Sequence, residues 1–421
     1  MATVISSVAE VCREAKRAAR ALAQIETATK DRALEAIAAA LEARLEEILA
    51  ANARDMQVGE EVDIGEALLD RLRLDEERVA GIAQAVREIV SLPDPVGEVI
   101  AGARLPNGLD VRKVRVPLGV VAVVYEARPN VTIDAAALCL KSGNAIVLRG
   151  SSSASHSNAA LAQIAADAAE GAGLPRGSVS LLAGGGHEEL AELATQEETV
   201  DLIIPRGGEG LKEALQSVAR VPVIYAASGN CHIYVDSAAD LEQAEAIVIN
   251  AKTQRPGVCN AAETVLIHSA RAPELVPRLV RSLEAAGVVL RGDDRTRALA
   301  AGTAVEEAQE EDWATEYLSL TLAMRVVDSL EDAIEHVGRY GSGHSEAIVT
   351  RDTGAARAFQ RAVDAACVYV NASTRFTDGG EFGMGAEIGN STQKLHARGP
   401  IGLRELCTFK YLVEGDGHVR G

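Results

Sequence analysis

Hydrophobic residues recur at intervals of three and four positions from Val4 to about Leu92, with polar residues between them. The stretches LAQIETATKDRALEAIAAALEARLEEILAAN and LRLDEERVAGIAQAVREIVSL carry this period, which predicts helices with one apolar face. Pro93 and Pro95 follow, and a helix does not continue through such a pair. We therefore expect a helical section that ends near residue 92.

A different pattern, the alternation of apolar and polar residues, runs from Leu105 to Arg115 around Asn107-Gly108. Asn-Gly between alternating residues predicts a β-hairpin. Such a ribbon, between helices and a parallel sheet, has few local partners, so we expect it to pair across a subunit interface. The C-terminal stretch ELCTFKYLV is a second candidate for this pairing, and we assign 104–116 and 400–421 to an oligomerisation ribbon and tail.

Short apolar segments then alternate with helical segments from residue 118 to about residue 235. Near-continuous apolar strands separated by helices indicate a parallel sheet that is covered on both faces. The fold class that follows is α/β, with a doubly wound nucleotide-binding domain. The predicted strands are GVVAVVY (119–125), AIVLR (145–149), VSLLA (179–183), DLIIP (201–205) and PVIYA (222–226), and the helices lie near 131–141, 154–171, 187–196 and 208–220.

A second alternation of the same kind begins near His232 and predicts a second α/β domain. We expect 1–103 with 117–231 to form the nucleotide-binding domain and 232–385 to form the catalytic domain. From Arg375 the chain is rich in glycine and polar residues, which is typical of a site loop. The strands of this half are HIYVD, ETVLIH, LAMRVV, EAIVT and CVYVN, and its helices lie near 240–254, 271–286, 329–339 and 353–363.

The composition and charge of the chain argue against several classes of function and site. The formal net charge is −19 and no dense stripe of Lys and Arg is present, which argues against a nucleic-acid partner. The six cysteines stand singly, without a CxxC pair or zinc-ligand spacing, so we expect no metal site and a reducing compartment. The chain has neither a signal-like apolar core nor a run of about 20 apolar residues. We therefore expect a cytoplasmic protein without a membrane segment.

The most informative segment is KTQRPGVCNAAETVLIH (252–268), in which Cys259 follows a helix and a Pro-Gly turn and precedes a buried strand. A cysteine on such a loop is accessible, and the neighbouring backbone N–H groups are available to an oxyanion. The polar neighbours Gln254, Arg255 and Asn260 favour a thiolate nucleophile over a structural thiol. The other five cysteines lie in helical or strand patterns and are expected to be structural.

The order of elements, with this cysteine loop before a strand, resembles the aldehyde dehydrogenase superfamily. Three further blocks resemble one branch of it, the glutamate-5-semialdehyde dehydrogenase family, also called γ-glutamyl phosphate reductases. The resemblance spans nearly the whole chain, and Val337 stands where that family usually has Ile. The blocks are VPLGVVAVVYEARPNVTIDAAALCLKSGNAIVLRG (116–150), AIEHVGRYGSGHSEAIVT (333–350) and FGMGAEIGNSTQKLHARGPIGL (382–403).

The resemblance implies an NADPH-dependent step of proline biosynthesis, in which L-glutamate 5-phosphate is reduced to L-glutamate 5-semialdehyde and phosphate is released. Cys259 would attack the acyl phosphate to form a thioester, which accepts hydride from NADPH far better than a carboxylate would. The implied partners are this small-molecule substrate and further copies of the chain in a homo-oligomer. Association with glutamate 5-kinase, which makes the substrate, is an open question.

The resemblance also bears on hydrolysis. Hydrolytic members of the superfamily carry a glutamate in an E-L-G-G-K-like turn, where it activates water against the thioester. The matching stretch YAASGNCHIYVD has Ala226 or Ala227 at that place. Without this base the thioester resists water, and phosphate exchange is the expected route. The alternative is that another carboxylate supplies the base.

For the oxyanion, the superfamily uses the cysteine backbone N–H and an Asn side chain from the loop after the first strand. In EARPNVT, both Arg128 and Asn130 are candidates, since a guanidinium suits an acyl phosphate. Asn130 is equally a candidate cap of the helix that follows. These alternatives stay open.

The cofactor contacts implied by the resemblance follow two strands of the nucleotide-binding domain. The strand AIVLR ends at Arg149, where the superfamily usually has Lys, and Ser151 and Ser152 follow. Ser152 stands where NAD-preferring relatives have Glu. An arginine with serines favours the 2′-phosphate of NADP. Gly207 and Gly208 resemble the glycine turn before a helix whose N-terminus lies beside the pyrophosphate.

Other positions match the superfamily or suit the substrate. Glu316 matches the acid that holds the nicotinamide ribose. The substrate is doubly anionic and needs cationic or N–H-rich partners. His344 has an alternative as a satisfied loop histidine, and Arg398 as a subunit contact. The expected substrate and phosphate contacts are Arg255, His344, Ser391, Thr392, Lys394 and Arg398.

Two other readings compete with this one. A hydrolytic aldehyde dehydrogenase acting on an unrelated aldehyde is disfavoured by the absent E-L-G-G-K acid. A non-catalytic oligomeric scaffold is disfavoured by the intact Cys259, Glu316 and glycine turns.

Overall fold

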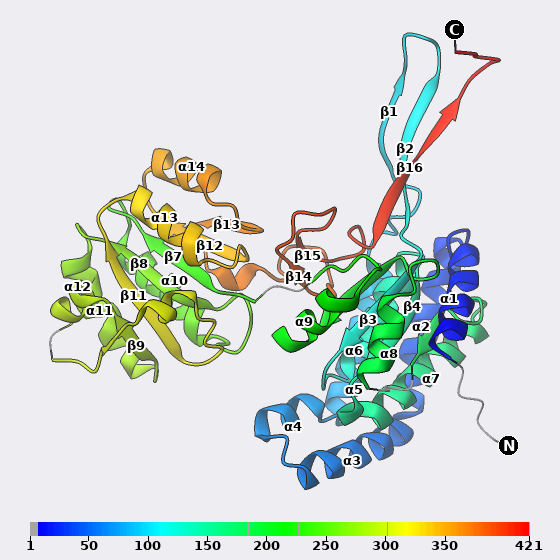
Figure 1. Ribbon diagram of the computed structural model, residues 1–421, viewed down its shortest axis with the longest axis horizontal. Coiled ribbons are helices and arrows are strands. Elements are labelled where there is room, and N and C mark those ends of the chain that lie inside the picture. Colours follow the sequence, from blue (N-terminus) through cyan, green and yellow to red (C-terminus); the bar gives the residue numbers. More distant parts are fainter. Residues whose placement is uncertain (1–6, 183–185, 226–227, 301, 421) are drawn as a thin grey trace. The chain divides into compact units, whose positions relative to one another are not determined.

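The computed structural model describes residues 7–182, 186–225, 228–300 and 302–420 and divides into two compact units (Figure 1). The first unit comprises Met1–Tyr225, Gly383–Gly389 and Ile401–Gly421. The second comprises Ala226–Phe382 and Asn390–Pro400. The chain therefore enters the second unit twice, and the Gly-rich segment near its end is divided between the two units.

The first unit begins with the helical section that the hydrophobic period predicts. Ser7 and Glu10 form a reciprocal capping box at the start of the first helix. The last of these helices ends at Ser91, before Pro93, as expected. The five helices are α1 (Val8–Leu22), α2 (Thr27–Ala43), α3 (Leu45–Glu61), α4 (Glu66–Leu72) and α5 (Glu76–Ser91).

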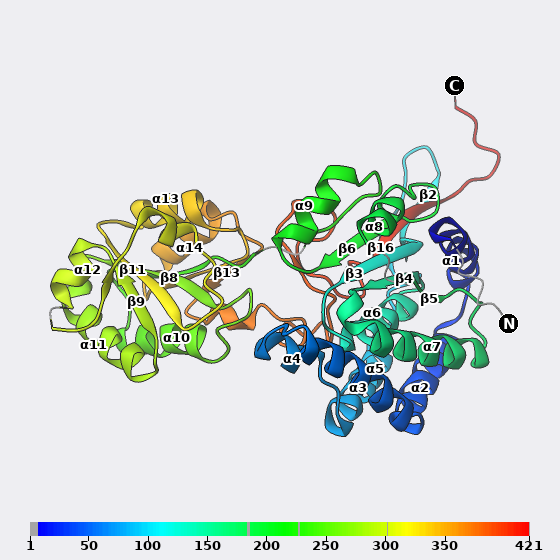
Figure 2. The same cartoon turned by 60° about the horizontal axis from the view of Figure 1, so that its bottom comes forward.

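Four parallel strands form the sheet of the first unit, in the order β5-β4-β3-β6. Helices α6 and α7 cover one face, and α8 and α9 cover the other (Figure 2). Parallel strands covered on both faces confirm the predicted α/β class. The elements are β3 (Val120–Tyr125), α6 (Asn130–Lys141), β4 (Ala145–Gly150), η1 (Ser152–Ala154), α7 (Ser155–Gly171), β5 (Val179–Leu181), α8 (His187–Ala194), β6 (Leu202–Arg206) and α9 (Glu209–Val218).

One predicted strand of this sheet, 222–226, does not form within the described residues. Only an isolated parallel bridge joins Ile203 to Val223. Pro222 has no N–H to donate, so its carbonyl oxygen alone is used, accepting from Ile203 N at 2.9 Å. The expectation of a full strand was wrong for this reason.

The second unit holds seven parallel strands in the order β10-β9-β11-β8-β7-β12-β13. Helices α10 and α11 pack their apolar sides on one face, and α13 and α14 pack on the other (Figure 2). The strands are β7 (Cys231–Val235), β8 (Ala262–His268), β9 (Val289–Gly292), β10 (Glu306–Glu307), β11 (Thr321–Val327), β12 (Ser345–Val349) and β13 (Cys367–Val370). The helices are α10 (Leu241–Thr253), α11 (Ala272–Ala285), α12 (Asp294–Leu299), α13 (Leu330–Tyr340) and α14 (Thr353–Ala362), with short turns η2 (Glu310–Ala314) and η3 (Thr374–Phe376).

The five predicted strands of this unit are confirmed, but β9, β10 and α12 were not predicted. β9 spans four residues and β10 only two, and β10 consists of two exposed glutamates. Segments this short and polar carry no usable hydrophobic period. They form because β11 and β9 offer adjacent edges to pair with.

The predicted hairpin is present as the antiparallel pair β1 (Val99–Arg104) and β2 (Asp110–Pro117), but its first strand lies before the predicted stretch, because Leu105 to Leu109 form the turn. The other edge of β2 pairs antiparallel with β16 (Cys407–Glu414) of the same chain. The C-terminal strand thus extends the hairpin within its own chain, and the pairing of this ribbon across a subunit interface stays a prediction. Arg112 of β2 and Glu414 of β16 form an ion pair although they are 302 residues apart in the sequence. No local pattern could predict this pairing of strands.

In the part of the chain that the structure describes, no helix is both long and apolar enough to cross a membrane. Among the same residues, no group of three or more His, Cys, Asp or Glu side chains is arranged to hold a metal ion.

Candidate active site

Cys259 lies on the turn between α10 and β8, as the pattern of the sequence predicts. All six cysteines are described, and five of them are buried while Cys259 is partly exposed. The Ala261 N–H closes the turn by donating to the Val258 carbonyl at 3.1 Å. Exposure on a tight turn separates Cys259 from the five structural thiols.

The carbonyl of Cys259 is enclosed by the segment that leads into β7. The Cys231 thiol donates to this carbonyl oxygen at a sulfur–oxygen distance of 3.2 Å. Gly229 packs so closely that a Cβ atom placed on it would lie 1.5 Å from the same oxygen. Burial raises the pKa of the Cys231 thiol well above its ordinary value, so Cys231 keeps its proton and acts as a donor.

Asn260, which follows the cysteine, ties the loop to the segment after β13. Its side-chain amide donates to the Thr377 carbonyl at 2.9 Å and to the Arg375 carbonyl at 3.3 Å. In return, the Thr374 hydroxyl donates to the Asn260 carbonyl at 2.7 Å. The turn η3 and the cysteine loop therefore form one hydrogen-bonded body.

Arg375 is a residue of this body that the sequence analysis did not single out. Its Nε donates to Gln254 Oε1 at 2.8 Å, so Arg375 contacts both ends of the cysteine loop. The available signal was its place at the start of the Gly-rich segment, five residues after the end of β13 at Val370. Its partners are 115 and 121 residues away in sequence, which is why no local pattern revealed them.

Glu316 lies beside the same segment. The Gly229 N–H donates to Glu316 Oε1 at 2.6 Å. A buried ion pair lies nearby, with Lys252 Nζ 2.5 Å from Glu263 Oε2 and both side chains fully buried. Burial raises the pKa of Glu263 to about 7 and lowers the pKa of Lys252. The pair fixes α10 to β8 at the base of the cysteine turn.

His344, predicted as a substrate contact, is almost completely buried next to Cys231. Its Nδ1 lies 2.8 Å from Ser345 Oγ and 3.9 Å from Cys231 Sγ. Burial lowers the pKa of His344 to about 4, so the imidazole is neutral at neutral pH. It can contribute a hydrogen bond but not a positive charge.

Three of the predicted substrate contacts, Thr392, Lys394 and Arg398, lie near Asp364, whereas Arg255 lies in the cysteine loop. Lys394 pairs with one oxygen of Asp364, and Arg398 Nη1 lies 2.8 Å from the other. Thr392, Lys394 and Arg398 line a pocket of about 360 Å³ together with Asp364. Ser391 is buried in β14 (Asn390–Ser391), which pairs with β15 (Gly399–Pro400), and its hydroxyl accepts from Gln393 N at 3.2 Å. Both cations of this group are thus matched by a carboxylate.

In the first unit, the predicted residues gather at the carboxyl edge of the sheet. The register pairs Tyr125 of β3 with Gly150 of β4 and with Arg206 of β6, so all three strands end together. Arg128 and Asn130 follow β3, Arg149 with Ser151 and Ser152 closes β4, and Gly207 with Gly208 follows β6. Ser151 Oγ accepts from Ala127 N at 3.1 Å, which joins two of these loops. This edge is where α/β sheets bind nucleotides.

Asn130 does not cap the helix after β3. The N-cap position of α6 is Pro129, without a side-chain cap, and Asn130 is the first helical residue. Its amide donates to Asp134 Oδ2 at 2.9 Å, one turn further on. Burial raises the pKa of Asp134 to about 6. The capping alternative was wrong, because the helix begins one residue earlier than a capping Asn would require.

The glycine turn after β6 presents the N-terminus of α9. Gly208 N–H donates to Glu126 Oε2 at 3.2 Å, and a Cβ on Gly207 would lie 2.7 Å from the Glu126 carboxyl carbon. The N-terminus of α7 is closed, because Asp55 accepts from the backbone N–H groups of His156 and Ser157 at 3.1 and 2.7 Å. A carboxylate therefore lies at the N-terminus of each of these two helices, Glu126 at α9 and Asp55 at α7.

Arg149 stands at the end of β4 with its guanidinium directed to α8. Its Nη2 donates to the Gly186 carbonyl at 3.0 Å, and its Nε lies 3.4 Å from Glu189 Oε1. Only 14% of the Arg149 side chain and 15% of the Glu189 side chain are exposed. Ser151 and Ser153 share a hydrogen bond of 2.6 Å between their hydroxyls.

Ala226 and Ala227, expected in place of the hydrolytic acid, lie outside the described residues.

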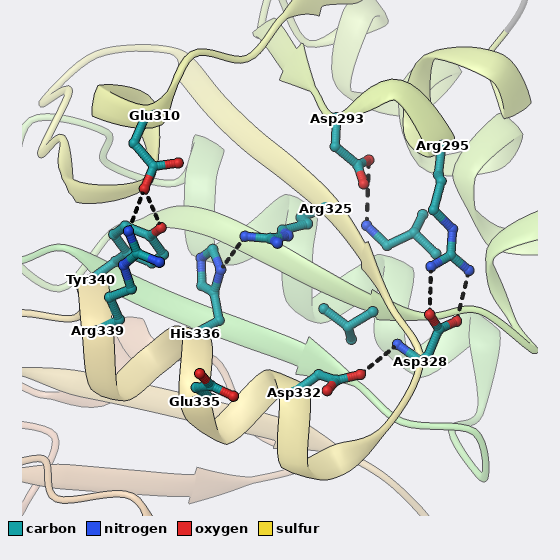
Figure 3. Close-up of a pocket in the computed structure, with 12 residues that line it drawn as sticks. Asp293, Arg295, Glu310, Arg325, Asp328, Asp332, Glu335, His336, Arg339 and Tyr340 are labelled. Atoms are coloured by element: carbon teal, nitrogen blue, oxygen red, sulfur yellow. Dashed lines mark hydrogen bonds and ion pairs between the residues drawn. The ribbon is translucent and has the colours of Figure 1, made fainter.

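A further polar pocket of about 440 Å³ lies at the carboxyl end of β11, against α13 (Figure 3). Arg325 Nη1 donates to His336 Nδ1 at 3.1 Å, and burial lowers the pKa of His336 to about 2, which keeps it a neutral acceptor. Arg295 forms a two-pronged pair with Asp328 at 2.8 and 2.9 Å. The arginines that line this pocket thus already bind other residues of its lining. We assign this pocket no part in the chemistry.

Comparison with known proteins decides the family. The profile of the aldehyde dehydrogenase family matches residues 4–323. A γ-glutamyl phosphate reductase of Heliobacterium modesticaldum is 55% identical, over 97% of each chain. One of Thermobifida fusca is 54% identical over the full length of both chains. The chain belongs to the γ-glutamyl phosphate reductases of the aldehyde dehydrogenase family.

Solved structures agree with this family. The crystal structure of γ-glutamyl phosphate reductase from Thermotoga maritima has a TM-score of 0.97 and 45% identity, covering 99% of this chain and all of that one. An acetylating aldehyde dehydrogenase from Geobacillus thermoglucosidasius, 21% identical, has a TM-score of 0.69 over 98% of this chain and 97% of that chain, and shares the fold. The resemblance stated from the motifs and the predicted fold class are both confirmed.

Proposed function

We propose that this protein reduces L-glutamate 5-phosphate to L-glutamate 5-semialdehyde, with release of phosphate, as a cytoplasmic enzyme of proline biosynthesis. The observation that carries the proposal is the setting of Cys259. It is the partly exposed cysteine of the chain, on a turn held by Cys231, Gly229 and Asn260. Full-length relatives named for this reaction support the same assignment.

The reaction begins with the Cys259 thiolate. Its sulfur attacks the acyl carbon, a sulfur–carbon bond forms, and the carbon–oxygen bond to phosphate breaks as phosphate takes the electron pair. The rigid turn holds the sulfur in place, because its carbonyl is bound by Cys231 and its neighbour Asn260 by η3. After reduction, the tetrahedral carbon releases the aldehyde and returns the thiolate.

The backbone at residues 259 and 260 and one side chain from the loop after β3 are the proposed oxyanion donors. We retain both Arg128 and Asn130 for the side-chain role, on the strength of the family resemblance. Asn130 is exposed and keeps one amide hydrogen beyond its bond to Asp134. His344 contributes to the substrate site as a neutral imidazole.

The family uses a nicotinamide cofactor, and we propose NADPH for this chain. At the carboxyl edge of the first sheet, Gly207 and Gly208 carry no side chain before α9, and a pyrophosphate there would replace Glu126 as the acceptor of the Gly208 N–H. Arg149, at the end of the neighbouring strand, is the proposed partner of the 2′-phosphate, which would replace its contacts to Gly186 and Glu189. Ser151 and Ser152 follow it in the chain. Glu316 is the proposed partner of the nicotinamide ribose. When bound, NADPH supplies the hydride that reduces the thioester.

A phosphate titration tests the reaction class and the cofactor together. The reverse reaction, oxidation of glutamate semialdehyde, should require phosphate and should proceed faster with NADP than with NAD, as followed by absorbance of the reduced cofactor. Oxidation at the same rate without phosphate would identify a hydrolytic aldehyde dehydrogenase instead. A chain that binds cofactor but turns over no aldehyde would be the non-catalytic scaffold.

We also propose that the β1-β2-β16 ribbon mediates a homo-oligomer. It exposes large apolar side chains, including Phe409, Tyr411 and Val413 of β16, which are 45%, 60% and 55% exposed. Clustered exposed apolar residues mark interaction surfaces. Replacing Phe409 and Tyr411 with serine should lower the mass in light scattering to that of a smaller species. An unchanged mass would show that the ribbon is not part of the interface. Light scattering of this protein mixed with glutamate 5-kinase tests whether the two proteins associate.

A further inference from the structure

The substrate proposed above carries a phosphate dianion next to the carbon that Cys259 attacks, and this group needs cationic partners. Two predicted partners, Lys394 and Arg398, both form ion pairs with Asp364. His344 is neutral, because burial lowers its pKa to about 4. The positive charge for the phosphate must therefore come from other residues near the cysteine.

Arg375 is held against the cysteine loop at two points. Its Nε donates to Gln254 Oε1 at 2.8 Å, five residues before Cys259. Its backbone carbonyl accepts from Asn260 Nδ2 at 3.3 Å, directly after Cys259. These contacts place the guanidinium alongside the loop, and Arg255 follows Gln254 in the same loop.

Within the described residues, neither Arg375 nor Arg255 forms a salt bridge. In the described part of the chain, neither guanidinium lies within 4.0 Å of a carboxylate oxygen, whereas Arg398 and Arg149 each have such a partner. Asp378 is the nearest acid in sequence, and its Oδ1 is engaged by the Gly380 N–H at 2.9 Å. Two guanidiniums without a salt bridge, next to a nucleophile, form a site that an anionic ligand completes.

The charges in this group affect one another. Burial and the neighbouring Arg255 lower the pKa of the Arg375 guanidinium. Asp378 and the Cys259 thiol act in the opposite direction with smaller effects. The attraction of both guanidiniums to a dianion offsets their mutual repulsion, and a monoanion offsets it less.

We propose that Arg375 and Arg255 form the subsite that binds the transferred phosphate group, beside the Cys259 thiol. This inference rests on the proposed function and names the residues that hold its leaving group. The two guanidiniums bind the phosphate oxygens while the carbon–oxygen bond breaks and the phosphate keeps the electron pair. In the reverse direction they hold inorganic phosphate for attack on the thioester, and the thiolate is the leaving group.

The test is steady-state kinetics of the reverse reaction with Arg375→Gln and Arg375→Lys. The Arg375→Gln enzyme should have a KM for phosphate raised at least about tenfold, since it loses one charge-assisted contact to the phosphate. The KM for the semialdehyde should change less than about twofold, and Arg375→Lys should lie between the two enzymes. Arg357→Gln removes an exposed arginine of α14 and should leave both constants unchanged.

A readout without turnover separates binding from folding. Phosphate should protect Cys259 from iodoacetamide in the wild type, and the half-protecting concentration should rise in parallel with KM in the Arg375→Gln enzyme. A rise in the semialdehyde KM with an unchanged phosphate KM would overturn the proposal and assign Arg375 to the α-carboxylate. A wild-type enzyme that needs no phosphate would instead refute the proposed function, so the two failures are distinguishable.

Discussion

The backbone of Gly229 lies against Cys259 so closely that a Cβ atom on residue 229 would stand 1.5 Å from the Cys259 carbonyl oxygen and 2.6 Å from its Cα. No side chain fits in this space, because real Cβ atoms do not approach closer than about 3 Å. The N–H of the same glycine donates to Glu316. One residue without a side chain thus connects the proposed nucleophile to the proposed ribose partner.

Replacing Gly229 with alanine should displace the cysteine turn. We expect Gly229→Ala to reduce kcat/KM by at least about a hundredfold, because a displacement of about 1 Å at a reacting group costs about that much. Gly257→Ala is the matched control in the same loop, since a Cβ there would meet its nearest atom at 3.7 Å. Equal activity of the Gly229→Ala and wild-type enzymes would mean that the close approach does not position Cys259.

Removing one partner of the buried Lys252–Glu263 pair should destabilise the fold far more than replacing both partners with apolar residues. Lys252→Met leaves a buried carboxylate without its cation and should lower the free energy of unfolding by roughly 3 to 5 kcal/mol. The double variant Lys252→Met/Glu263→Leu should recover most of this loss, as measured by urea denaturation. Additive losses in the double variant would contradict a coupled pair.

Lys252→Met should also show a distinctive pH dependence. Burial raises the pKa of Glu263 above its ordinary value of 4.5 even with its cation present. Above pH 4.5 the unfolded chain releases this proton while the folded chain retains it, so stability falls as pH rises through the folded pKa. Denaturation of Lys252→Met between pH 5 and 9 should therefore show a decline that the double variant lacks.

Arg149 should determine the preference for NADPH. Arg149→Gln should lower kcat/KM for NADPH by about 10- to 100-fold, because one charge-assisted contact to the 2′-phosphate is lost. The value for NADH, which lacks this phosphate, should change by less than about twofold. Arg176→Gln is the control, since Arg176 is 81% exposed and pairs with Glu14 on the surface. An equal loss with both cofactors would show that Arg149 supports the loop and not the 2′-phosphate.

His344 should make the fold sensitive to acid. Burial lowers its pKa from 6.5 to about 4, so between these values the unfolded chain binds a proton that the folded chain does not. Stability should fall as the pH drops through this window, by up to about 3 kcal/mol at pH 4. His344→Asn should flatten this part of the curve, while His187→Asn, at an exposed position of α8, should not. An unchanged slope in His344→Asn would exclude a buried neutral imidazole.

The local patterns of the sequence were sufficient for most elements and for the family. The period of the first 92 residues, the alternating strands and helices, and the Asn-Gly hairpin each became the predicted structure. They did so because these signals come from neighbours within about ten positions. Two elements were not predicted correctly, for different reasons. β10 forms only along the edge of β9, which lies outside that range, whereas 222–226 is limited by its own Pro222, a local feature.

The sequence by itself determined which residue types carry the chemistry, because Cys259, the glycine turn and Arg149 stand in segments whose local order is distinctive. The tertiary structure alone decided which charges are available to a ligand. Lys394 and Arg398 are adjacent to the motif yet matched by Asp364, whereas Arg375 meets the cysteine loop from more than a hundred residues away. The physical reason is that an ion pair depends on distance in space, and spacing along the chain does not encode it.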